Sequence, residues 1–449
     1  MSQFFFRNLK KTYPTVASAK GVHITDTTGK IYLDACSGAV VANLGHGLAE
    51  INDAINAQLA KVAFAHTSQF VSEVGLELAA KVVALTPPGF RDGARAYFMS
   101  GGSEAVETAI KMARSYFVHR GENARTICFS RHQSYHGSTF GALSATGHPA
   151  RRKPYVAMLR SSAHVLADYK YRCKCGFGPG PCLKDECSIA AANELEDAII
   201  SAGSDNVMAF IAEPIVGATL GAAVPGPAYF PRIREICDKY GILFIADEVM
   251  TGFGRTGTTF GMNHFGVVPD IIALGKGMAA GYQPLAAVLA SGRVVKAFEE
   301  STGVFEHGFT YSAHPVSCAA GLAAIDYLEK HNLVQIVADR EEALFQRAEK
   351  LRNIGIIGDI RGRGFMMGIE FVKNIETKEP FPAEVRISQL VAQEAMKNGL
   401  LVYPGSGFID GVNGDHIMIA PPFTSSDAEL DEMFELLKPA LEAVCLSMN

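Results

Sequence analysis

The sequence predicts an α/β fold in which a large domain with a mainly parallel central sheet is combined with a small α+β domain. Short apolar runs that end at polar or glycine-rich turns alternate with helical periodicity through the middle of the chain, which is typical of a parallel sheet. Beyond Gly308 the pattern changes to two long helical segments and then to strands of alternating polarity. We therefore expect an N-terminal segment at 1–60 that is part of the small domain, the large domain at 61–325, and the C-terminal small domain at 326–449.

The first predicted element is a β-hairpin at residues 22–33, where polarity alternates on both sides of a Thr-Gly turn. Apolar residues at helical spacing predict helices at 51–61, 71–85, 105–117, 316–330 and 333–351. Apolar runs and alternating segments predict strands at 94–99, 126–129, 207–212, 242–246, 270–274, 286–290, 360–371, 400–403 and 416–420. Ser426 and Glu429 form a capping box that opens a last helix, which Pro439 is expected to kink.

The composition indicates a protein with a large buried core. Hydrophobic residues make up 48% of the 449 residues and charged residues 19%, against about 25% charged residues in typical globular proteins. The net charge is −5 and no block of like charges stands out, so neither nucleic acid nor a membrane surface is expected as a partner. No apolar run approaches the roughly 18 residues of a membrane span, and the apolar block at the N-terminus is too short for a signal peptide. We expect a soluble cytoplasmic protein.

Two ionisable side chains stand at the ends of apolar strands. Asp247 closes the run at 242–246, and Lys276 follows the run at 270–274. Parallel sheets bind ligands at the carboxyl ends of their strands, and a lysine amine there can form a Schiff base with an aldehyde cofactor while an aspartate pairs with a pyridinium nitrogen. The hypothesis is a pyridoxal phosphate (PLP) site. The alternative is that Asp247 caps a turn and that Lys276 is a solvated loop residue.

Gly101-Gly102-Ser103, between a predicted strand and a helix, indicates an anion site. Glycines let the backbone approach a ligand closely, and helix N–H groups together with a serine hydroxyl favour a phosphate. The alternative is that Ser103 serves only as an N-cap.

Other residues are weaker candidates when taken one at a time. Tyr135, beside His136 in a turn after a strand, could stack on a planar cofactor, with ordinary packing as the alternative. Val249, two residues beyond Asp247, could cover the opposite face of such a ring.

Polar residues in the C-terminal half add two further candidates. Thr310 lies in a glycine-flanked loop. Arg361 and Arg363 lie in a predicted strand, where an inward-facing arginine is costly unless it meets an anion. One of the two arginines is therefore a candidate for binding a substrate carboxylate.

Two further motifs do not support the chemistry that they first suggest. Gly252, Gly254 and Gly257 match the G-x-G-x-x-G pattern, but no helix is predicted directly after them, so dinucleotide binding is not expected. Four of the nine cysteines crowd into a loop rich in proline and glycine, namely Cys173, Cys175, Cys182 and Cys187. Their spacing, C-x-C-x6-C-x4-C, matches no common zinc template. We expect thiols in a surface excursion and no metal site.

Together, these residues resemble the class III (subgroup II) aminotransferases of PLP fold type I. The resemblance spans nearly the whole chain, and its most specific part is the spacing of Asp247, Val249 and Lys276 with Thr310 following. It implies that Lys276 is the catalytic lysine, which forms the Schiff base with PLP and moves a proton between the substrate carbons. It implies that Asp247 is the catalytic partner of the ring nitrogen, because a pyridinium is the electron sink of the reaction.

The resemblance also implies further contacts with the cofactor and the substrate. The expected cofactor contacts are Gly101, Gly102 and Ser103 at the phosphate, Tyr135 and Val249 on the two ring faces, His136 beside Tyr135, Glu213 close to the cofactor, and Thr310 reaching the phosphate from a neighbouring subunit. The expected substrate contacts are Arg361, as the carboxylate-binding arginine, Val40 and Tyr135. A homodimer with shared active sites follows, and a tetramer is left open.

The implied reaction is the ping-pong transfer of an amino group from an amine or ω-amino acid to an α-keto acid. Members specialised for glutamate carry a second glutamate a few residues after Glu213-Pro214, where this chain has Ala218. That departure favours the ω-amino acid or amine:pyruvate branch, with pyruvate as acceptor. Val40, with Ala39, stands where many amine:pyruvate enzymes place a bulky aromatic residue, which suggests a wider pocket. The alternatives are an aminomutase or decarboxylase on the same fold, and a non-enzymatic binding protein on that scaffold.

Overall fold

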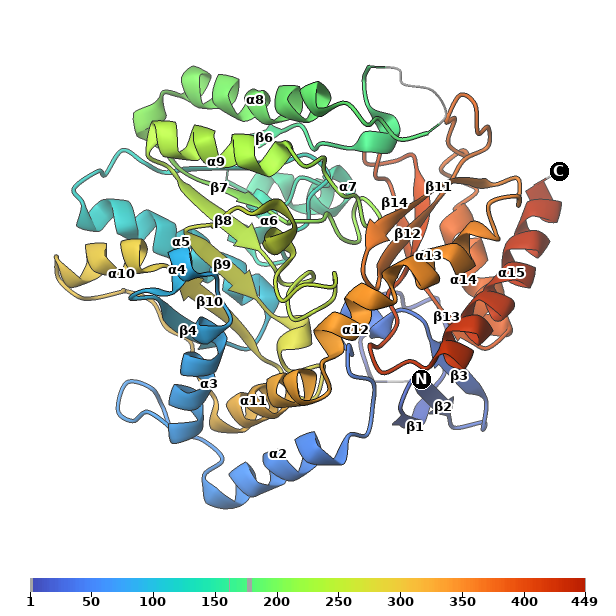
Figure 1. Ribbon diagram of the computed structural model, residues 1–449, viewed down its shortest axis with the longest axis horizontal. Helices are drawn as coiled ribbons and strands as arrows, with labels where there is room; N and C mark the ends of the chain where they lie inside the picture. The colour runs from blue at the N-terminus through green and yellow to red at the C-terminus, as the bar shows by residue number, and fades with distance from the viewer. Residues whose placement is uncertain (1–2, 161, 176–179, 449) are drawn as a thin grey trace.

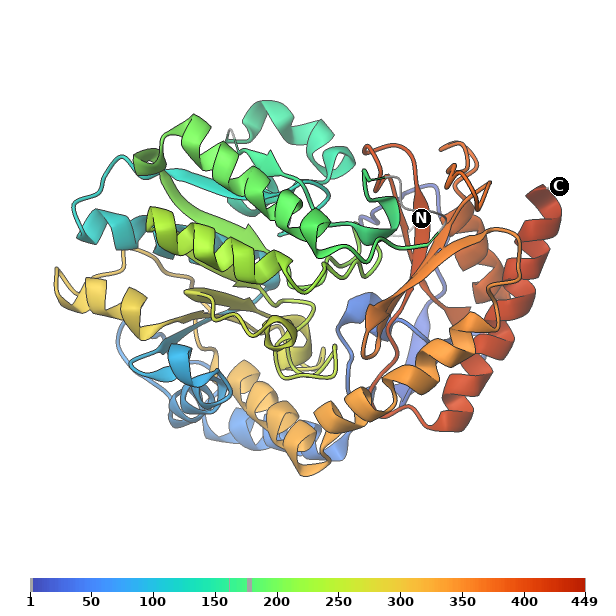
Figure 2. The same ribbon diagram turned by 45° about the horizontal axis from the view of Figure 1, so that its top comes forward.

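The structure is a computed structural model that describes residues 3–160, 162–175 and 180–448. The chain forms a larger lobe around a seven-stranded sheet and a smaller lobe around two four-stranded sheets (Figure 1). Helices α11 (Pro315–Lys330) and α12 (Leu333–Asp339) run from the larger lobe towards the smaller one (Figure 2). Within the described residues, no helix is both long enough and apolar enough to span a bilayer.

The central sheet of the larger lobe has the strand order β4-β10-β9-β8-β7-β5-β6. Strand β10 is antiparallel to both of its neighbours, and the other strands share one direction. This confirms the predicted mainly parallel sheet. Its strands are β4 (Arg95–Met99), β5 (Ile127–Arg131), β6 (His164–Val165), β7 (Val207–Ala212), β8 (Leu243–Asp247), β9 (Ile271–Leu274) and β10 (Ala286–Ala290).

Helices cover both faces of this sheet, which explains why its inner strands are continuously apolar. Helix α5 (Gly102–His119) packs on one face, against β7 to β10. Helices α8 (Asp185–Ala202) and α9 (Tyr229–Tyr240) pack on the other face, with α3 (Glu73–Ala84) and α11 near β4. The remaining helices are α1 (Ser37–Val40), α2 (Ala49–Lys61), α4 (Pro88–Arg91), α6 (Phe140–Ala145), α7 (Pro149–Arg152), α10 (Gly292–Glu299), α13 (Glu341–Glu349), α14 (Ile387–Lys397) and α15 (Asp427–Met448).

The smaller lobe combines segments from both ends of the chain. One sheet has the order β1-β2-β3-β13, so the N-terminal strands pair with a strand near the C-terminus. The other has the order β11-β12-β15-β14. Their strands are β1 (Val16–Lys20), β2 (His23–Asp26), β3 (Ile31–Asp34), β11 (Ile357–Arg363), β12 (Met366–Phe371), β13 (Leu400–Leu401), β14 (Tyr403–Ser406) and β15 (Asp415–Ile419). The domain limits at residues 60 and 325 stay predictions.

The prediction of a single strand at 360–371 is wrong, because the chain turns back at Gly364 to form the antiparallel pair β11 and β12. Gly364 has a φ of +56°, and a Cβ there would lie 2.5 Å from the carbonyl carbon of Thr256. Only glycine tolerates both conditions. The predicted helix at 333–351 likewise divides into α12 and α13, at Arg340.

The last helix begins as predicted. The Ser426 hydroxyl accepts a hydrogen bond from the Glu429 N–H (3.2 Å), and the Glu429 carboxylate accepts one from the Ser426 N–H (2.7 Å), which confirms the capping box. Helix α15 continues through Pro439 as one element.

A buried arginine links the loop after β8 to the smaller lobe. Arg255 is 2% exposed, and its guanidinium donates to the carbonyl oxygens of Phe365 (2.9 Å) and Pro421 (2.7 Å). The guanidinium also lies 4.6 Å from the centre of the Phe423 ring. Burial lowers the pKa of Arg255 to about 9, because desolvation disfavours the charged form.

Replacing Arg255 with methionine is expected to destabilise the protein, because two buried carbonyl oxygens lose their donor at a cost of about 1–3 kcal/mol each. The urea concentration at half-unfolding measures the effect. The matched control is Arg352→Met, which removes a half-exposed pair with Glu349 and should cost less than about 1 kcal/mol. Equal shifts for the two variants would contradict the role assigned to Arg255.

Candidate active site

Three ionisable residues come together because their strands are parallel neighbours. Glu213 follows β7, Asp247 ends β8, and Lys276 follows β9. Ala212 pairs with Ala246, and Asp247 pairs with Ala273, so the carboxyl ends of the three strands are level. All three side chains line one cavity of about 210 Å³. Its other lining residues are Gly102, Ser103, Tyr135, His136, Gly137, Ala218, Val249 and Met250.

Asp247 is held in a single orientation by its neighbours. The side chain is 5% exposed, and its Oδ2 lies 2.7 Å from Nδ1 of His136, the ring nitrogen that donates to it. Its Oδ1 accepts a hydrogen bond from the Val249 N–H (3.2 Å). A carboxylate that is oriented in this way can accept a further hydrogen bond from a cationic group in the cavity.

Lys276 has a strained backbone and a desolvated amine. Its φ is +42°, a left-handed conformation that costs a non-glycine residue of order 1–3 kcal/mol and is found mainly at functional sites. Burial lowers the pKa of the amine, although the carboxylates of Asp247 and Glu213 oppose the shift. The lower pKa favours the neutral amine, which is the nucleophilic form.

One corner of the cavity has groups that suit an anion. Helix α5 begins at Gly102, so its first N–H groups, which have no partner within the helix, lie at the cavity. The Ser103 hydroxyl accepts a hydrogen bond from the Ser138 N–H (3.0 Å). A Cβ at Gly102 would lie 2.7 Å from Cγ1 of Val249, so glycine is required there. Gly101 is the N-cap residue and does not line the cavity.

Tyr135, Val249 and Glu213 complete the walls. The Tyr135 hydroxyl lies 2.9 Å from that of Ser138. The Glu213 carboxylate accepts hydrogen bonds from the N–H groups of Tyr135 (3.4 Å) and Gly217 (3.2 Å). Burial raises the pKa of Glu213, and the Asp247 carboxylate adds to that shift.

These groups match the parts of PLP one by one. A helix N-terminus and a hydroxyl suit its phosphate, a tyrosine ring and an aliphatic side chain suit the faces of its pyridine ring, a buried carboxylate suits its ring nitrogen, and an amine suits its aldehyde. One PLP molecule can contact both Asp247 and Lys276 only if the two side chains share a cavity, and they do. A larger cavity of about 770 Å³ elsewhere holds none of the predicted site residues.

The structure does not bring Arg361 to this cavity. Its guanidinium contacts the carboxylates of Asp359 (3.0 Å) and Glu370 (2.7 Å) and donates to the carbonyl oxygen of Leu220 (2.8 Å). Burial acts to lower the pKa of Arg361, but Tyr169 and the two carboxylates outweigh it and raise that pKa. Its role in binding a substrate carboxylate stays a prediction, and it would require one of the two carboxylates to move away.

Two other predicted residues also lie outside the cavity lining. Thr310 is exposed on the surface of the chain. Val40 is 2% exposed and belongs to an apolar cluster that includes Ala218 and Met250, which do line the cavity. Val40 therefore supports the wall from behind.

Sequence reasoning missed Arg151, at the edge of the site. Its guanidinium lies 4.7 Å from the centre of the Tyr135 ring. Burial lowers the pKa of His416, which contacts the carbonyl oxygen of Ala218, and the charges of Arg361 and Arg151 add to that shift. No ion pair between Arg151 and a carboxylate occurs within residues 3–160, 162–175 and 180–448. An Arg-Arg pair after a proline is no sequence signal for a binding site. Arg151 becomes a candidate only because the fold places it beside Tyr135.

Comparison with known proteins agrees with this geometry. The family model described as aminotransferase class-III matches residues 5–441. The uncharacterized aminotransferase YodT of Bacillus subtilis is 41% identical over 447 residues, which cover 99% of this chain and 98% of that protein. The putrescine–pyruvate aminotransferase of Pseudomonas aeruginosa is 34% identical over 429 residues, which cover 95% of this chain and 90% of the relative.

A solved structure extends the likeness to the fold. An amine transaminase from an uncultivated Pseudomonas species, in its PLP-bound form, superposes with a TM-score of 0.90 at 32% identity, covering 100% of this chain and 99% of the other. The fold is PLP fold type I, and the cofactor of the family is PLP. The chain belongs to the class III aminotransferases.

Proposed function

We propose that this aminotransferase moves an amino group from a primary amine or ω-amino acid to pyruvate, with Lys276 and Asp247 as its catalytic residues. The observation that carries the proposal is that a buried carboxylate, a desolvated amine and the N-terminus of helix α5 line one cavity. The similarity to a putrescine–pyruvate aminotransferase supports the choice of donor and acceptor.

Each residue has one task in this proposal. PLP supplies an aldehyde that captures amines and a ring that delocalises the electron pair released at the substrate carbon. The neutral amine of Lys276 moves the proton at that carbon, and Asp247, held by His136, keeps the ring nitrogen protonated. The N–H groups of α5 and the Ser103 hydroxyl hold the phosphate. Tyr135 and Val249 position the ring between them.

The Lys276→Ala variant is expected to lose its covalent link to PLP and to slow the half-reaction with an amine by about 10²–10⁴-fold or more, because the proton carrier is gone. Borohydride reduction followed by intact mass measurement reads the link, and stopped-flow absorbance reads the rate. The matched control is Lys239→Ala, at a surface lysine that pairs with Glu196. This variant should keep both the covalent link to PLP and the normal rate. A Lys276→Ala chain that still gains the mass of the reduced cofactor would disprove the assignment.

The cavity favours a keto acid with a single carboxylate. Of the described residues that line it, none is an arginine, and the charge of Arg361 is already paired with Asp359 and Glu370. A second carboxylate, as in 2-oxoglutarate, would therefore meet no guanidinium inside. We infer that Arg151, which lies over the Tyr135 ring, receives the one carboxylate of pyruvate at the edge of the cavity.

Removing that guanidinium tests the inference. Arg151→Ala should raise the KM for pyruvate about tenfold or more, because a hydrogen bond to a charged group contributes about 1.5–3 kcal/mol, while the half-reaction with an amine donor that has no carboxylate stays near normal. The neighbouring variant Arg152→Ala is the control, because the Arg152 guanidinium faces His164 (3.4 Å). Equal effects of the two variants, or a wild-type preference for 2-oxoglutarate, would refute it.

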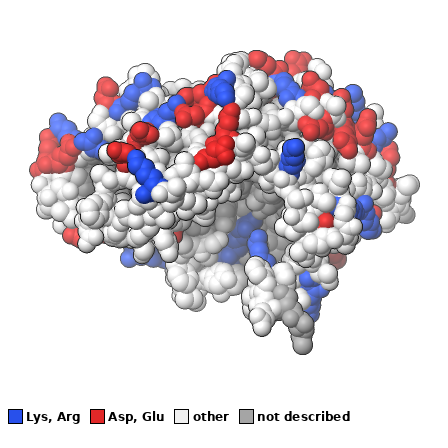
Figure 3. Space-filling model, turned by 90° about the horizontal axis from the view of Figure 1, so that it is seen from below, with Lys and Arg blue, Asp and Glu red and all other residues white. Residues whose placement is uncertain are grey.

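We infer that the enzyme is a homodimer in which Thr310 of one subunit reaches the phosphate site of the other. Thr310 is exposed, and beside it Tyr311 is 59% exposed with its ring 6.1 Å from that of Phe64, which is 44% exposed. Phe70 and Val71 are also largely exposed. Figure 3 shows the molecule from the side on which α2 and α11 lie. Most charged side chains in this view lie along one edge, and a broad area around a hollow has few charged side chains. Exposed apolar surface of this kind is typical of an interface.

Thr310→Val removes the hydroxyl with little change in shape, so it should weaken PLP binding several-fold, in line with a hydrogen bond of about 0.5–1.5 kcal/mol, and leave the dimer intact. Light scattering measures the assembly, and titration of the apoenzyme measures the affinity. Thr302→Val, in the same exposed loop, is the control. A fully active monomer would rule out the shared site.

A cytoplasmic location stays a prediction from the sequence.

A further inference from the structure

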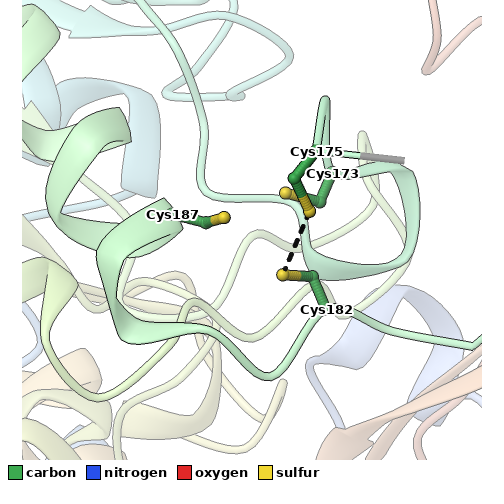
Figure 4. A group of neighbouring side chains, drawn as sticks. All are labelled: Cys173, Cys175, Cys182 and Cys187. Atoms are coloured by element: carbon green, nitrogen blue, oxygen red, sulfur yellow. Dashed lines mark hydrogen bonds between the residues drawn. The ribbon is translucent and has the colours of Figure 1, made fainter. Parts of the chain in front are cut away.

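Four cysteine side chains converge outside the active site. Cys173, Cys175, Cys182 and Cys187 all lie in described segments, and their sulfur atoms lie within 4.8 Å of one another (Figure 4). Sγ of Cys175 is 3.5 Å from Sγ of Cys182. Three of the four residues are at least partly buried. This grouping depends on how the loop folds back on helix α8, so the spacing along the sequence does not predict it.

The distances have the size that a tetrahedral thiolate site requires. Zinc–sulfur bonds are about 2.3 Å long, and in a tetrahedron this places the sulfur atoms about 3.8 Å apart. We propose that Cys173, Cys175, Cys182 and Cys187 bind one Zn²⁺ ion as a structural Cys₄ site. Binding exchanges four thiol protons for the metal and involves no change of oxidation state.

Other uses of four cysteines fit these distances less well. A disulfide requires its sulfur atoms about 2.05 Å apart, and Cys175 and Cys182 are much farther apart than that. An iron–sulfur cluster is bound by thiolates on different iron atoms, so its four cysteine sulfurs surround a larger object than a single ion. A group of four sulfurs within 4.8 Å encloses a single ion.

The backbone around the cluster is fixed on both sides. Cys173 follows a short 3₁₀ turn at Lys170–Arg172, and Cys187 lies in the first turn of α8. The Cys182 N–H donates to the carbonyl oxygen of Lys170 (2.9 Å), which closes the excursion at its base. Two ends held in this way bring the sulfur atoms together before a metal arrives, which lowers the entropy cost of binding.

Basic side chains balance the two negative charges of a zinc tetrathiolate. Lys174 stands between Cys173 and Cys175, and Lys184 stands two residues after Cys182, although Asp185 and Glu186 precede Cys187. The Lys378 amine donates to the carbonyl oxygens of Tyr171 (2.6 Å) and Gly180 (3.1 Å), on either side of the first two cysteines in sequence. The Lys378 amine therefore adds a positive charge to the segment that carries the cysteines.

The excursion that the metal would close is a strap between the two lobes. Tyr171, two residues before Cys173, is 1% exposed, and its hydroxyl occupies the space beside Gly358 and Val372 in the smaller lobe. Arg172 pairs with the buried Glu370 on β12 (2.7 Å). Zinc at the four cysteines would hold both contacts in place, so the metal has a structural task that is separate from the chemistry of PLP.

The test is metal analysis of the full-length holoenzyme purified under reducing conditions from cells supplied with zinc. We expect one zinc per chain by mass spectrometry of the metals, and loss of that zinc in Cys182→Ser and Cys187→Ser. Cys128→Ser and Cys445→Ser, at cysteines outside the cluster, should keep it. The visible absorbance of bound PLP confirms folding in each variant, so failure of the zinc site and failure of the proposed transaminase function are distinguishable.

A second measurement avoids substitutions. Treatment of the wild-type enzyme with a strong chelator should release zinc and make four additional thiols reactive, and Co²⁺ added afterwards should give the intense thiolate-to-cobalt absorption of a tetrahedral site. A protein that contains no zinc and binds no Co²⁺, one whose four cysteines form disulfides, or one that contains iron instead would overturn the proposal.

Discussion

A carboxylate kept out of water at the end of strand β8 is the constraint on which the candidate active site depends. Asp247 is 5% exposed, and a buried charge is costly unless it is paired and hydrogen-bonded. The fold meets that cost with His136, the Val249 N–H and the nearby amine of Lys276. Each of these partners comes from a different turn at the same edge of the sheet. The parallel arrangement of β7, β8 and β9 therefore positions both the charge and the groups that stabilise it.

Outside the cavity, buried arginines between the lobes pair with polar groups that would otherwise be buried without a partner. Arg255 satisfies carbonyl oxygens of the smaller lobe. Arg361 lies between Asp359 and Glu370, and the hydroxyl of Tyr169 donates to Glu370 as well. A network with this many paired charges loses several kcal/mol when one member is removed, since the others are left buried without a partner. In this network Arg361 fixes the lobes relative to each other, and that leaves the cavity itself without a guanidinium.

Two loops of the larger lobe lie outside the cavity and differ in what they contact. The cysteine-bearing segment places Tyr171 and Arg172 against the smaller lobe, and its sulfur atoms form a compact group that the PLP site does not use. The loop that carries Thr310 lies on the surface beside exposed aromatic residues. The first loop contributes contacts between the lobes of one chain, and the second carries the exposed Thr310 for which we propose a contact with a partner subunit.

The sequence by itself determined the mainly parallel sheet and six of its seven strands, because apolar runs are local signals, but it did not predict strand β6 or helices α8 and α9. It also determined that Ser103, Asp247 and Lys276 follow strands, and parallel strands bring their ends to one edge. Only the tertiary structure decided the turn at Gly364, the pairing of Arg361, the place of Arg151 and the meeting of the four cysteines. Those features depend on contacts between distant residues, such as Arg172 and Glu370, which are 198 positions apart, and no local pattern records such a contact.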